Sequence, residues 1–426
     1  MVFLFDNKYS FDIILLERSD KMKFQIIDTS KIVIITFIFS ALIMILMKKI
    51  AAHVGAIDVP RSDEGNRHIH KKATPKLGGV GIFLGFLIGY MLFGEQSLRM
   101  NAILIGSFIV VLTGILDDIK PIKASHKMLG HIAAASIITF YGGILLDQIS
   151  AFGYTIEFGL FAYPITILFI IACTNIINLI DGLDGLSGGI CTIFYITIAI
   201  IGFYQGRYGS LVMILTLIML GSTLGFLLHN FNPATIFAGD CATFMGFIIS
   251  IITLLEFKGP ALISFFVPLT ILGIPILDTL FAIIRRLLKK QPPFKADKEH
   301  LHHQLLGMNF SPRTTVLIIY AINIVFAAAS IFYTLKDQMM GIALYIIIFI
   351  MVIWFVFHTS IISEKNPKFA KKIKDKLKIE KKKNEEEIKR QTKNLHNSLF
   401  TDSGGALCVY LCSTQGIRYF CGNIYR

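Results

Sequence analysis

The stretch that decides the fold is residues 160–204, which read LFAYPITILFIIACTNIINLIDGLDGLSGGICTIFYITIAIIGFY. The runs 160–177 and 188–204 contain no charged residue, and each is close to the ~20 residues that a helix needs to cross the hydrocarbon core of a bilayer. Between them lie the aspartates Asp181 and Asp184 and several glycines. The stretch therefore predicts two membrane helices joined by a polar turn, and that turn needs its own explanation.

The composition of the whole chain indicates the same class of protein. Hydrophobic residues make up 54% of the chain and charged residues only 16%, which is too few to cover a soluble surface. We predict an all-α polytopic membrane protein whose transmembrane domain spans residues 31–360. About eleven transmembrane helices are expected, near residues 32–47, 77–93, 101–116, 129–146, 160–177, 188–204, 211–228, 243–255, 261–284, 315–335 and 341–357.

Lysine and arginine are distributed unevenly between the predicted loops. Most lie after the first, third and ninth helices, as Lys48, Lys49, Arg61, Arg67, Lys71, Lys72, Lys76, Lys120, Lys123, Lys127, Arg285, Arg286, Lys289, Lys290, Lys295, Lys298 and Arg313. The alternate loops contain at most one each. Because cytoplasmic loops are enriched in these residues, we expect the N-terminus outside and the C-terminus inside. The net charge of +13 follows from this topology, so we expect no nucleic-acid partner.

The two ends of the chain carry less information. Residues 1–30 are predicted to be an N-terminal extension, within which Met22 is a candidate start of translation. Residues 361–426 are predicted to be a basic cytoplasmic tail without a catalytic role. Three of the six cysteines lie in that tail without paired metal-site spacing, and the other three lie in or beside helices, so we interpret all six as free thiols.

Polar residues gather where the helices reach the predicted cytoplasmic face. The four clusters read GILDDIKPIKASHK (114–127), NIINLIDGLDGLSGG (175–189), HNFNPATIFAGD (229–240) and KADKEHLHHQLLGMNFSPR (295–313). Each alone has an ordinary interpretation, as a solvated loop, a glycine turn or a helix start. Together they place carboxylates, amides, histidines and lysines on one face, which is what a magnesium-dependent reaction on a phosphorylated substrate needs. A site at the membrane surface indicates that one substrate or product is a lipid.

The order of these clusters resembles the polyprenyl-phosphate N-acetylhexosamine-1-phosphate transferase family. The upstream TPKLGG (74–79) is similar to the Pro-x-x-Gly-Gly signature of that family. The resemblance implies transfer of a sugar-1-phosphate from a UDP-sugar to undecaprenyl phosphate, with release of UMP. It further implies Mg²⁺ as the cofactor, with Mn²⁺ as an alternative, a bacterial plasma membrane location, and a homodimer.

The resemblance also implies roles for individual residues. Asp240 and Asn178 match the metal ligands. The catalytic residues would be Asp117, Asp118, Asp240, His302 and His303, with the aspartate pair at the acceptor. Substrate-binding residues would be Lys120, Lys123, Lys127, Asn175, Asp181, Asp184, Asn232 and His300. Since the second pKa of a phosphomonoester is about 6, the lipid phosphate needs little deprotonation. We therefore expect Asp117 to position the acceptor through Lys120 or Lys123, and keep a role as general base as a hypothesis.

The cluster ADKEHLHHQLL (296–306) favours one branch of the family. The branch that uses UDP-N-acetylmuramoyl-pentapeptide typically shows Pro-x-His-His-His-Phe-Glu there, so the resemblance favours UDP-N-acetylglucosamine as donor. For the intramembrane Asp278, a structural hydrogen-bonding role and a role as a direct ligand are both left open. The family pattern is not followed at Cys241–Thr243, after the expected metal ligand, or at His131, where glutamine is usual. A transporter of nucleotide sugars or lipid-linked intermediates is the alternative from another class, but it would place ionisable residues near mid-membrane.

Overall fold

The computed structural model describes residues 7–58, 73–151, 154–256 and 301–335, with isolated positions between 273 and 350. The chain divides into two units, Met1–His358 and Thr359–Arg426. The second unit, which contains the predicted tail, lies outside the described residues. The predicted helices 261–284 and 341–357 also fall in parts where only isolated positions are described, so they stay predictions.

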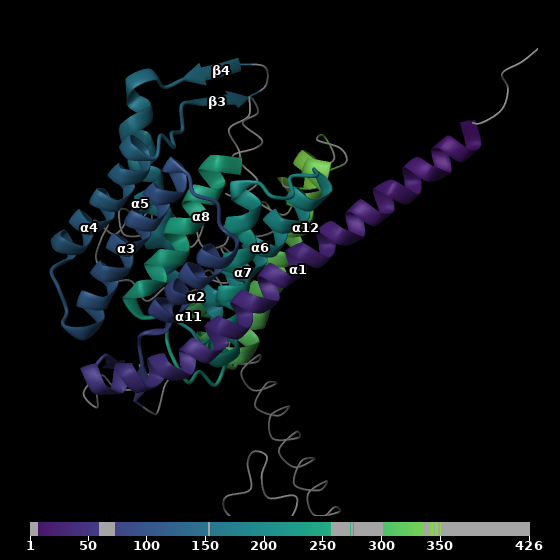
Figure 1. Cartoon of the computed structure of the whole chain (residues 1–426). Helices are drawn as coiled ribbons and strands as arrows, with labels where there is room; N and C mark the ends of the chain where they lie inside the picture. Colours follow the sequence, from purple (N-terminus) through teal and green to yellow (C-terminus); the bar gives the residue numbers. More distant parts are fainter. Residues whose placement is uncertain are drawn as a thin grey trace, which may run out of the picture. The chain divides into compact units, whose positions relative to one another are not determined.

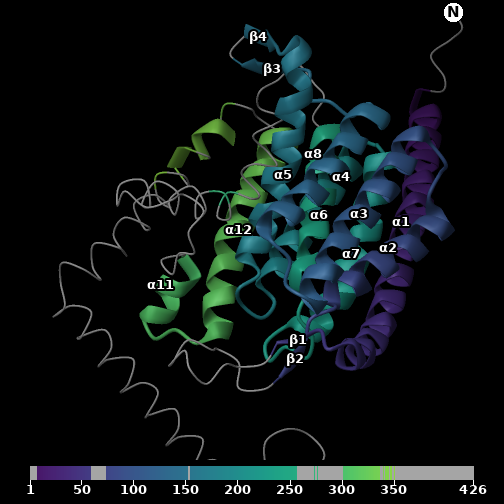
Figure 2. The ribbon, with the colours of Figure 1, turned by 90° about the vertical axis from the view of Figure 1, so that its left-hand side faces the viewer.

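The first unit is a bundle of membrane-length helices (Figures 1 and 2). Its helices are α1 (Asn7–Val54), α2 (Gly78–Phe93), α3 (Leu98–Ile119), α4 (Ala124–Ser136), α5 (Ala162–Ile180), α6 (Leu186–Tyr204), α7 (Leu211–Asn230), α8 (Thr243–Glu256), α11 (Leu301–Gly307) and α12 (Pro312–Leu335). Seven spans among the described residues are long and apolar enough to cross a membrane, and α2 is a shorter apolar helix. The prediction of an all-α polytopic membrane protein is confirmed.

Small residues bring three of these helices close together. α7 packs against both α1 and α2, and the Ser40 hydroxyl of α1 donates a hydrogen bond to the Ser222 carbonyl of α7 at 2.7 Å. A Cβ added at Gly85 of α2 would lie 2.9 Å from Cβ of Ser40, so the glycine is needed for this spacing. Close approach through glycine and serine is the usual way in which membrane helices associate.

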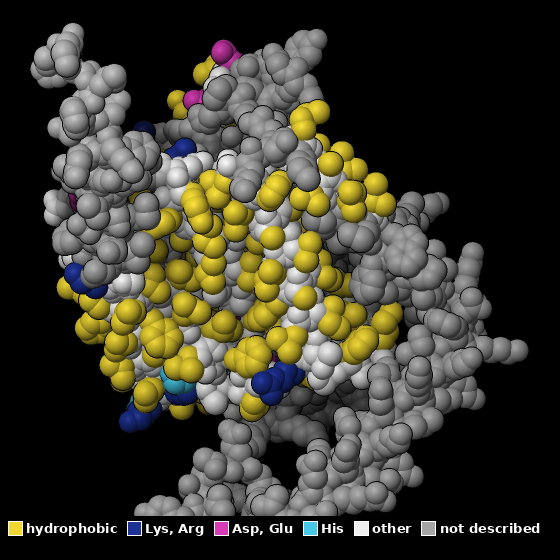
Figure 3. All heavy atoms as spheres, turned by 90° about the vertical axis from the view of Figure 1, so that its right-hand side faces the viewer, with side chains coloured by type: hydrophobic (Ala, Val, Ile, Leu, Met, Phe, Trp, Pro, Cys, Tyr) yellow, Lys and Arg dark blue, Asp and Glu magenta, His cyan; other side chains and the backbone are white. Residues whose placement is uncertain are grey.

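The outer surface of the bundle is apolar. Large side chains such as Leu42, Phe108 and Leu168 are exposed, which would be costly in water but not in lipid. Figure 3 shows one face covered by hydrophobic side chains, with lysine and arginine at its margins. This distribution is expected of a bundle whose middle contacts hydrocarbon and whose ends contact headgroups and water.

Several helix boundaries and two short sheets differ from the sequence prediction. The first helix, expected near residues 32–47, is α1 and begins at Asn7, within the predicted N-terminal extension. The helix expected at 129–146 begins at Ala124 and ends in a π-helical turn, η2 (Ile137–Tyr141). Hydropathy marks the lipid-buried part of a helix, whereas this helix starts earlier, among polar residues. A hairpin of β3 (Gln148–Ala151) and β4 (Tyr154–Glu157) follows, and its β-branched residues suit strands.

The second sheet is a ribbon of β1 (Ile57–Asp58) and β2 (Thr74–Pro75), with Asp58 opposite Thr74. It lies at the opposite end of the bundle from β3 and β4 (Figure 2). The segment after β2 is joined by backbone hydrogen bonds to the residues before α8. Phe237 N–H donates to Pro75 O at 2.8 Å, and Gly78 N–H donates to Phe237 O at 2.8 Å. This end of the bundle is where the polar clusters meet.

Candidate active site

A pocket of about 320 Å³ opens at the β1–β2 end of the bundle. Its polar lining comprises Asp58, Lys76, Asp118, Asn178, Asp181, Asp184, Asn230 and Asp240. These residues come from the ribbon, the end of α3, the end of α5 with its following turn, and the connection between α7 and α8. Three of the four predicted polar clusters therefore contribute to a single pocket.

Lys127 joins two of the predicted aspartates. Its ammonium lies 3.2 Å from Oδ2 of Asp117 and also pairs with Oδ1 of Asp240. The second oxygen of Asp117 accepts a hydrogen bond from Ile122 N–H at 2.9 Å. Burial favours the neutral amine, but the hydrogen bonds and charges of both carboxylates outweigh it and raise the pKa of Lys127. Lys127 is therefore a fixed positive charge between two negative ones.

Asp118 holds the backbone of Asp240. Both carboxylate oxygens of Asp118 lie 3.0 Å from Asp240 N, at the first turn of the short helix η4 (Gly239–Ala242) that leads into α8. A carboxylate at this position complements the positive end of a helix. Gly239 has a φ of 70°, and a Cβ there would collide with the Asp118 carboxylate. Asp118 therefore positions Asp240, which is a more specific role than contact with the acceptor.

The turn between α5 and α6 contains two aspartates in different surroundings. Asp181 is half-buried and accepts a hydrogen bond from the Ser187 hydroxyl. Burial, together with the nearby carboxylates of Asp240 and Asp184, raises the pKa of Asp181 to about 6, although the bond from Ser187 opposes this. An aspartate held in this way has a strong electrostatic reason to bind a cation or a hydrogen-bond donor of a substrate.

Asp184 is almost fully buried, with 4% of its surface exposed. Its Oδ2 accepts hydrogen bonds from Asn232 Nδ2 at 3.0 Å and from Ala234 N–H at 2.9 Å. Close by, Gly185 N–H donates to Asn230 Oδ1 at 2.9 Å. Asp184 and the predicted Asn232 thus tie the α5–α6 turn to the α7–α8 connection, and both side chains serve the architecture of the site.

Residues of α11 and α12 contact the same turn. A Cβ added at Gly182 would lie 3.0 Å from Nε2 of His302, so this buried histidine packs beside Asp181. The Tyr320 hydroxyl of α12 donates a hydrogen bond to the Gly185 carbonyl. His302 therefore lies next to the α5–α6 turn, and its predicted catalytic role stays a prediction. His300 and the side chain of His303 lie outside the described residues.

The remaining predicted residues lie around this core. Nδ2 of Asn175 is 2.8 Å from Ile171 O and 3.5 Å from Nδ1 of His131, one helical turn from Asn178. Lys120 and Lys123 are exposed in the connection between α3 and α4. Since Asp117 is bound by Lys127, the expected positioning of the acceptor through Lys120 or Lys123 is not the arrangement seen here.

Oxygen donors at the site fit a magnesium ion. Asn178 Nδ2 lies 3.4 Å from Oδ1 of Asp240, and rotation of the amide would present its oxygen. Among the described residues, no group of three or more His, Cys, Asp and Glu is placed to hold a metal ion. A protein-only cage is not what Mg²⁺ requires, because it commonly binds one or two carboxylates and takes its other ligands from water and substrate phosphates.

Sequence reasoning missed five residues of the site. They are Asp58, Lys76, Ser187, Asn230 and Tyr320. Asn230 is a buried polar residue at the end of α7. It lies within the quoted cluster 229–240, so the sequence did contain a signal for it. Tyr320 gave no signal, because a single tyrosine in an apolar helix is normally a packing residue.

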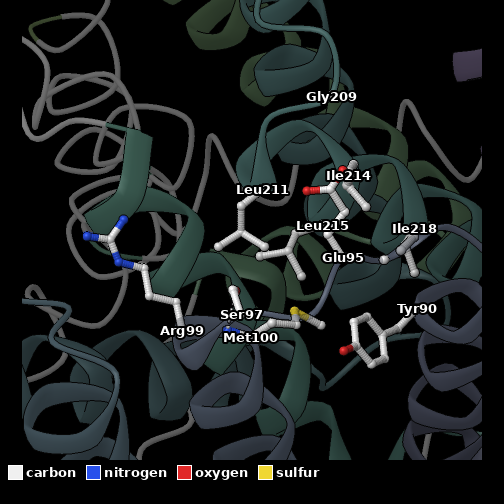
Figure 4. A pocket seen from close by; sticks show the side chains of 11 residues that line it. Tyr90, Glu95, Ser97, Arg99, Met100, Gly209, Leu211, Ile214, Leu215 and Ile218 are labelled. Carbon is white, nitrogen blue, oxygen red and sulfur yellow. Dashed lines mark hydrogen bonds between the residues drawn. The ribbon is translucent and has the colours of Figure 1, made fainter.

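A second pocket, of about 230 Å³, lies at the other ends of α2, α3 and α7. Figure 4 shows Tyr90, Arg99 and Leu211 around it. Its lining is largely apolar and contains one carboxylate, that of Glu95. The clustered aspartates described above are all at the opposite end of these helices.

Comparison with known proteins agrees with the geometry. The model of glycosyl transferase family 4 matches residues 100–256. The chain is 41% identical over 346 residues to the probable undecaprenyl-phosphate N-acetylglucosaminyl 1-phosphate transferase of Bacillus subtilis, covering 79% of this chain and 94% of that relative. It is 30% identical over 326 residues to the decaprenyl-phosphate N-acetylglucosaminephosphotransferase of Mycobacterium tuberculosis (68% and 80%). It is 28% identical over 294 residues to the undecaprenyl-phosphate alpha-N-acetylglucosaminyl 1-phosphate transferase of Escherichia coli (66% and 78%). The chain therefore belongs to glycosyl transferase family 4, the family that its four motifs indicate.

Proposed function

We propose that this protein transfers N-acetylglucosamine-1-phosphate from UDP-N-acetylglucosamine to undecaprenyl phosphate, and so begins the synthesis of teichoic acid or a related surface glycan. The observation that carries the proposal is the assembly of Asp117, Lys127, Asp240, Asn178 and Asp181 at one end of a membrane bundle. The names of the relatives support the donor sugar and the lipid acceptor.

The reaction balances without an additional proton donor or acceptor. An oxygen of the lipid phosphate attacks the phosphorus that carries the sugar, a new P–O bond forms, and the bond from that phosphorus to the UMP oxygen breaks. Because the second pKa of a phosphomonoester is about 6, the attacking oxygen is already anionic at neutral pH. Both oxygens of Asp117 are engaged by Lys127 and Ile122, which fits a positioning role better than that of a base.

The main task of the site is then to offset negative charge. Asp240 and Asn178 would hold Mg²⁺, which when bound stabilises charge on the phosphate oxygens. Lys127 lies against Asp240 and supplies a positive charge at the same place. Asp181, with its raised pKa, lines the pocket beside them and is placed to accept a hydrogen bond from a hydroxyl or N–H group of the nucleotide sugar.

The proposed site faces the cytoplasm, where nucleotide sugars are made. At the β1–β2 end, the helix termini and connections carry Lys48, Lys49, Lys76, Lys120, Lys123, Lys127 and Arg313, while the described residues at the other ends of the spans and their connections include Lys31, Arg99 and Arg207. This asymmetry supports a cytoplasmic location of the site by the positive-inside rule.

Two other functions are less well supported. Phospho-N-acetylmuramoyl-pentapeptide transfer would use the same chemistry, but the named relatives act with N-acetylglucosamine. A transporter would need ionisable groups near mid-membrane, whereas the charged residues in the described spans lie within about two turns of an end of the span.

The test uses purified protein with undecaprenyl phosphate, MgCl₂ and either UDP-N-acetylglucosamine or UDP-N-acetylmuramoyl-pentapeptide. We expect UMP and a lipid-linked product from the first donor alone, and neither from Asp240→Ala. A product from the muramoyl donor alone would reassign the branch. The proposal would be refuted if neither donor gave a lipid-linked product although the protein showed a cooperative thermal unfolding transition, which indicates that it is folded.

A further inference from the structure

We infer that Lys76 binds a phosphate oxygen of the substrate, and that Asp58 holds its ammonium in place until the phosphate arrives. This inference rests on the proposed function and adds to it a residue outside the aspartate and histidine motifs. Lys76 follows β2 directly and lines the pocket that contains Asp118, Asp181 and Asp240.

The backbone around Lys76 is fixed on both sides. Lys76 N–H donates to Ala56 O at 3.0 Å, and the neighbouring Pro75 O accepts from Phe237 N–H at 2.8 Å. Gly79 N–H donates to Ala238 O at 2.9 Å. A Cβ at Gly239 would collide with the carbonyl oxygen of Lys76, so Lys76 lies directly against the residue that precedes Asp240. A phosphate bound by Lys76 would therefore be near Asp240, the proposed metal ligand.

The charges in the pocket require such a cation. The lining contains the carboxylates of Asp58, Asp118, Asp181, Asp184 and Asp240, and Lys76 is the one lysine or arginine among its described lining residues. Five carboxylates would repel a substrate that carries phosphate groups. Lys127 is engaged by two carboxylates at once. Lys76 pairs with the carboxylate of Asp58, and its positive charge also interacts electrostatically with the carboxylate of Asp118.

The pair between Lys76 and Asp58 is suited to exchange. Nζ of Lys76 lies 3.2 Å from Oδ1 of Asp58, and the two side chains are 33% and 39% exposed. An ion pair with this exposure is weak because water screens it. A phosphate offers a lysine stronger, charge-assisted hydrogen bonds, so it can displace Asp58. Asp58 would then limit the rotamers of Lys76 beforehand and lower the entropic cost of binding.

The phosphate could belong to the diphosphate of the donor or to the lipid acceptor, and kinetics separates the two. We would measure the KM for each substrate with Lys76→Gln, Lys76→Arg and Asp58→Asn, using Lys49→Gln as control. Lys49 is an exposed lysine at the same end of the bundle that does not line the pocket. Calorimetric titration with UMP and MgCl₂ gives a binding readout that does not depend on turnover.

Lys76→Gln should raise the KM of one substrate at least tenfold, and Lys76→Arg should keep that KM within about threefold of wild type. A rise for UDP-N-acetylglucosamine with weaker UMP binding assigns the donor, and a rise for undecaprenyl phosphate alone assigns the acceptor. Asp58→Asn should raise the affected KM, but by less than Lys76→Gln does, since it frees the rotamers of Lys76 and leaves the positive charge in place. Lys49→Gln should match wild type.

Two results would overturn the inference. One is a Lys76→Gln enzyme with both KM values within twofold of wild type. The other is an equal loss in Lys76→Gln and Lys76→Arg, which would indicate lost packing and not lost charge. These outcomes concern ratios between active enzymes. Failure of the proposed function is a separate result, because wild type would then make no lipid-linked product.

Discussion

The two aspartates of the α5–α6 turn should respond in opposite ways to removal. Asp184→Ala deletes the acceptor of two partly buried hydrogen bonds, from Asn232 Nδ2 and Ala234 N–H. A hydrogen bond to a charged group contributes about 1.5–3 kcal/mol net, so the two together contribute about 3–6 kcal/mol. At about 2 °C per kcal/mol for a domain of this size, Tm should fall by about 6–12 °C.

Asp181→Ala should behave differently. Its carboxylate accepts a hydrogen bond from the Ser187 hydroxyl, and its raised pKa means that the ionised form is disfavoured by the fold. We expect Tm to change by less than about 2 °C, in the range of an unremarkable substitution. Activity should fall at least a hundredfold, because the lost carboxylate lines the pocket.

Thermal unfolding can be followed with a thiol-reactive dye. Cys173, Cys191 and Cys241 are buried and become reactive only on unfolding, and the tail cysteines would be replaced by serine to remove their signal. Steady-state kinetics with UDP-N-acetylglucosamine is measured on the same preparations. An Asp184→Ala protein with an unchanged Tm and a KM for the donor raised tenfold or more would show that Asp184 is a ligand, and the structural reasoning would be wrong.

Three further predictions concern the same site. Asp117→Asn should lose activity by a factor that is the same from pH 6 to 9, because the carboxylate positions Lys127; recovery of its rate at high pH would instead indicate a general base. The pKa of Asp181 is about 6 in the fold against 3.8 for an unperturbed aspartate, so the folded protein holds this proton more tightly and its stability falls as pH rises from about 4 to 6. In EDTA and without substrate, the Tm of Asp181→Asn minus that of wild type should therefore increase over this interval, and a constant difference would contradict the pKa. Tyr320→Phe removes the hydrogen bond to Gly185 O and should lower kcat a few-fold with little change in Tm. Tyr320→Leu, which also removes the ring, is the control for lost packing. An unchanged kcat in Tyr320→Phe would exclude a role for this hydrogen bond.

The helices of this fold could be predicted from sequence because a membrane restricts the choices. A long uncharged run in lipid must satisfy its own backbone, which only a helix or a closed barrel can do. The prediction of α8, the least hydrophobic span, also held. The β1–β2 ribbon could not be predicted, since strands of two residues carry no periodic pattern and their pairing spans residues 58 to 74.

The sequence could predict which residues belong to the site better than it could predict how they contact one another. Asp117, Lys127 and Asp240 could each be selected as polar residues at helix ends, but the ion pair between Lys127 and Asp240 joins positions 113 residues apart. Asp118 and Asp184 look equivalent to their neighbours in the sequence. Only the fold turns their carboxylates toward backbone N–H groups of the α7–α8 connection.

The departure from the family pattern at Cys241–Thr243 is explained by the same connection. Cys241 is fully buried, and its Sγ lies 3.5 Å from Val111 O. Cβ atoms added at Gly79 and Gly114 would both meet Cys241, so this residue fills the space between α2 and α3 next to Asp240. Thr243 donates its hydroxyl to Asp240 O at 2.7 Å and supports the turn from below. Cys241 and Thr243 therefore affect the packing and the backbone next to Asp240. The carboxylate of Asp240 still lines the pocket beside Asn178.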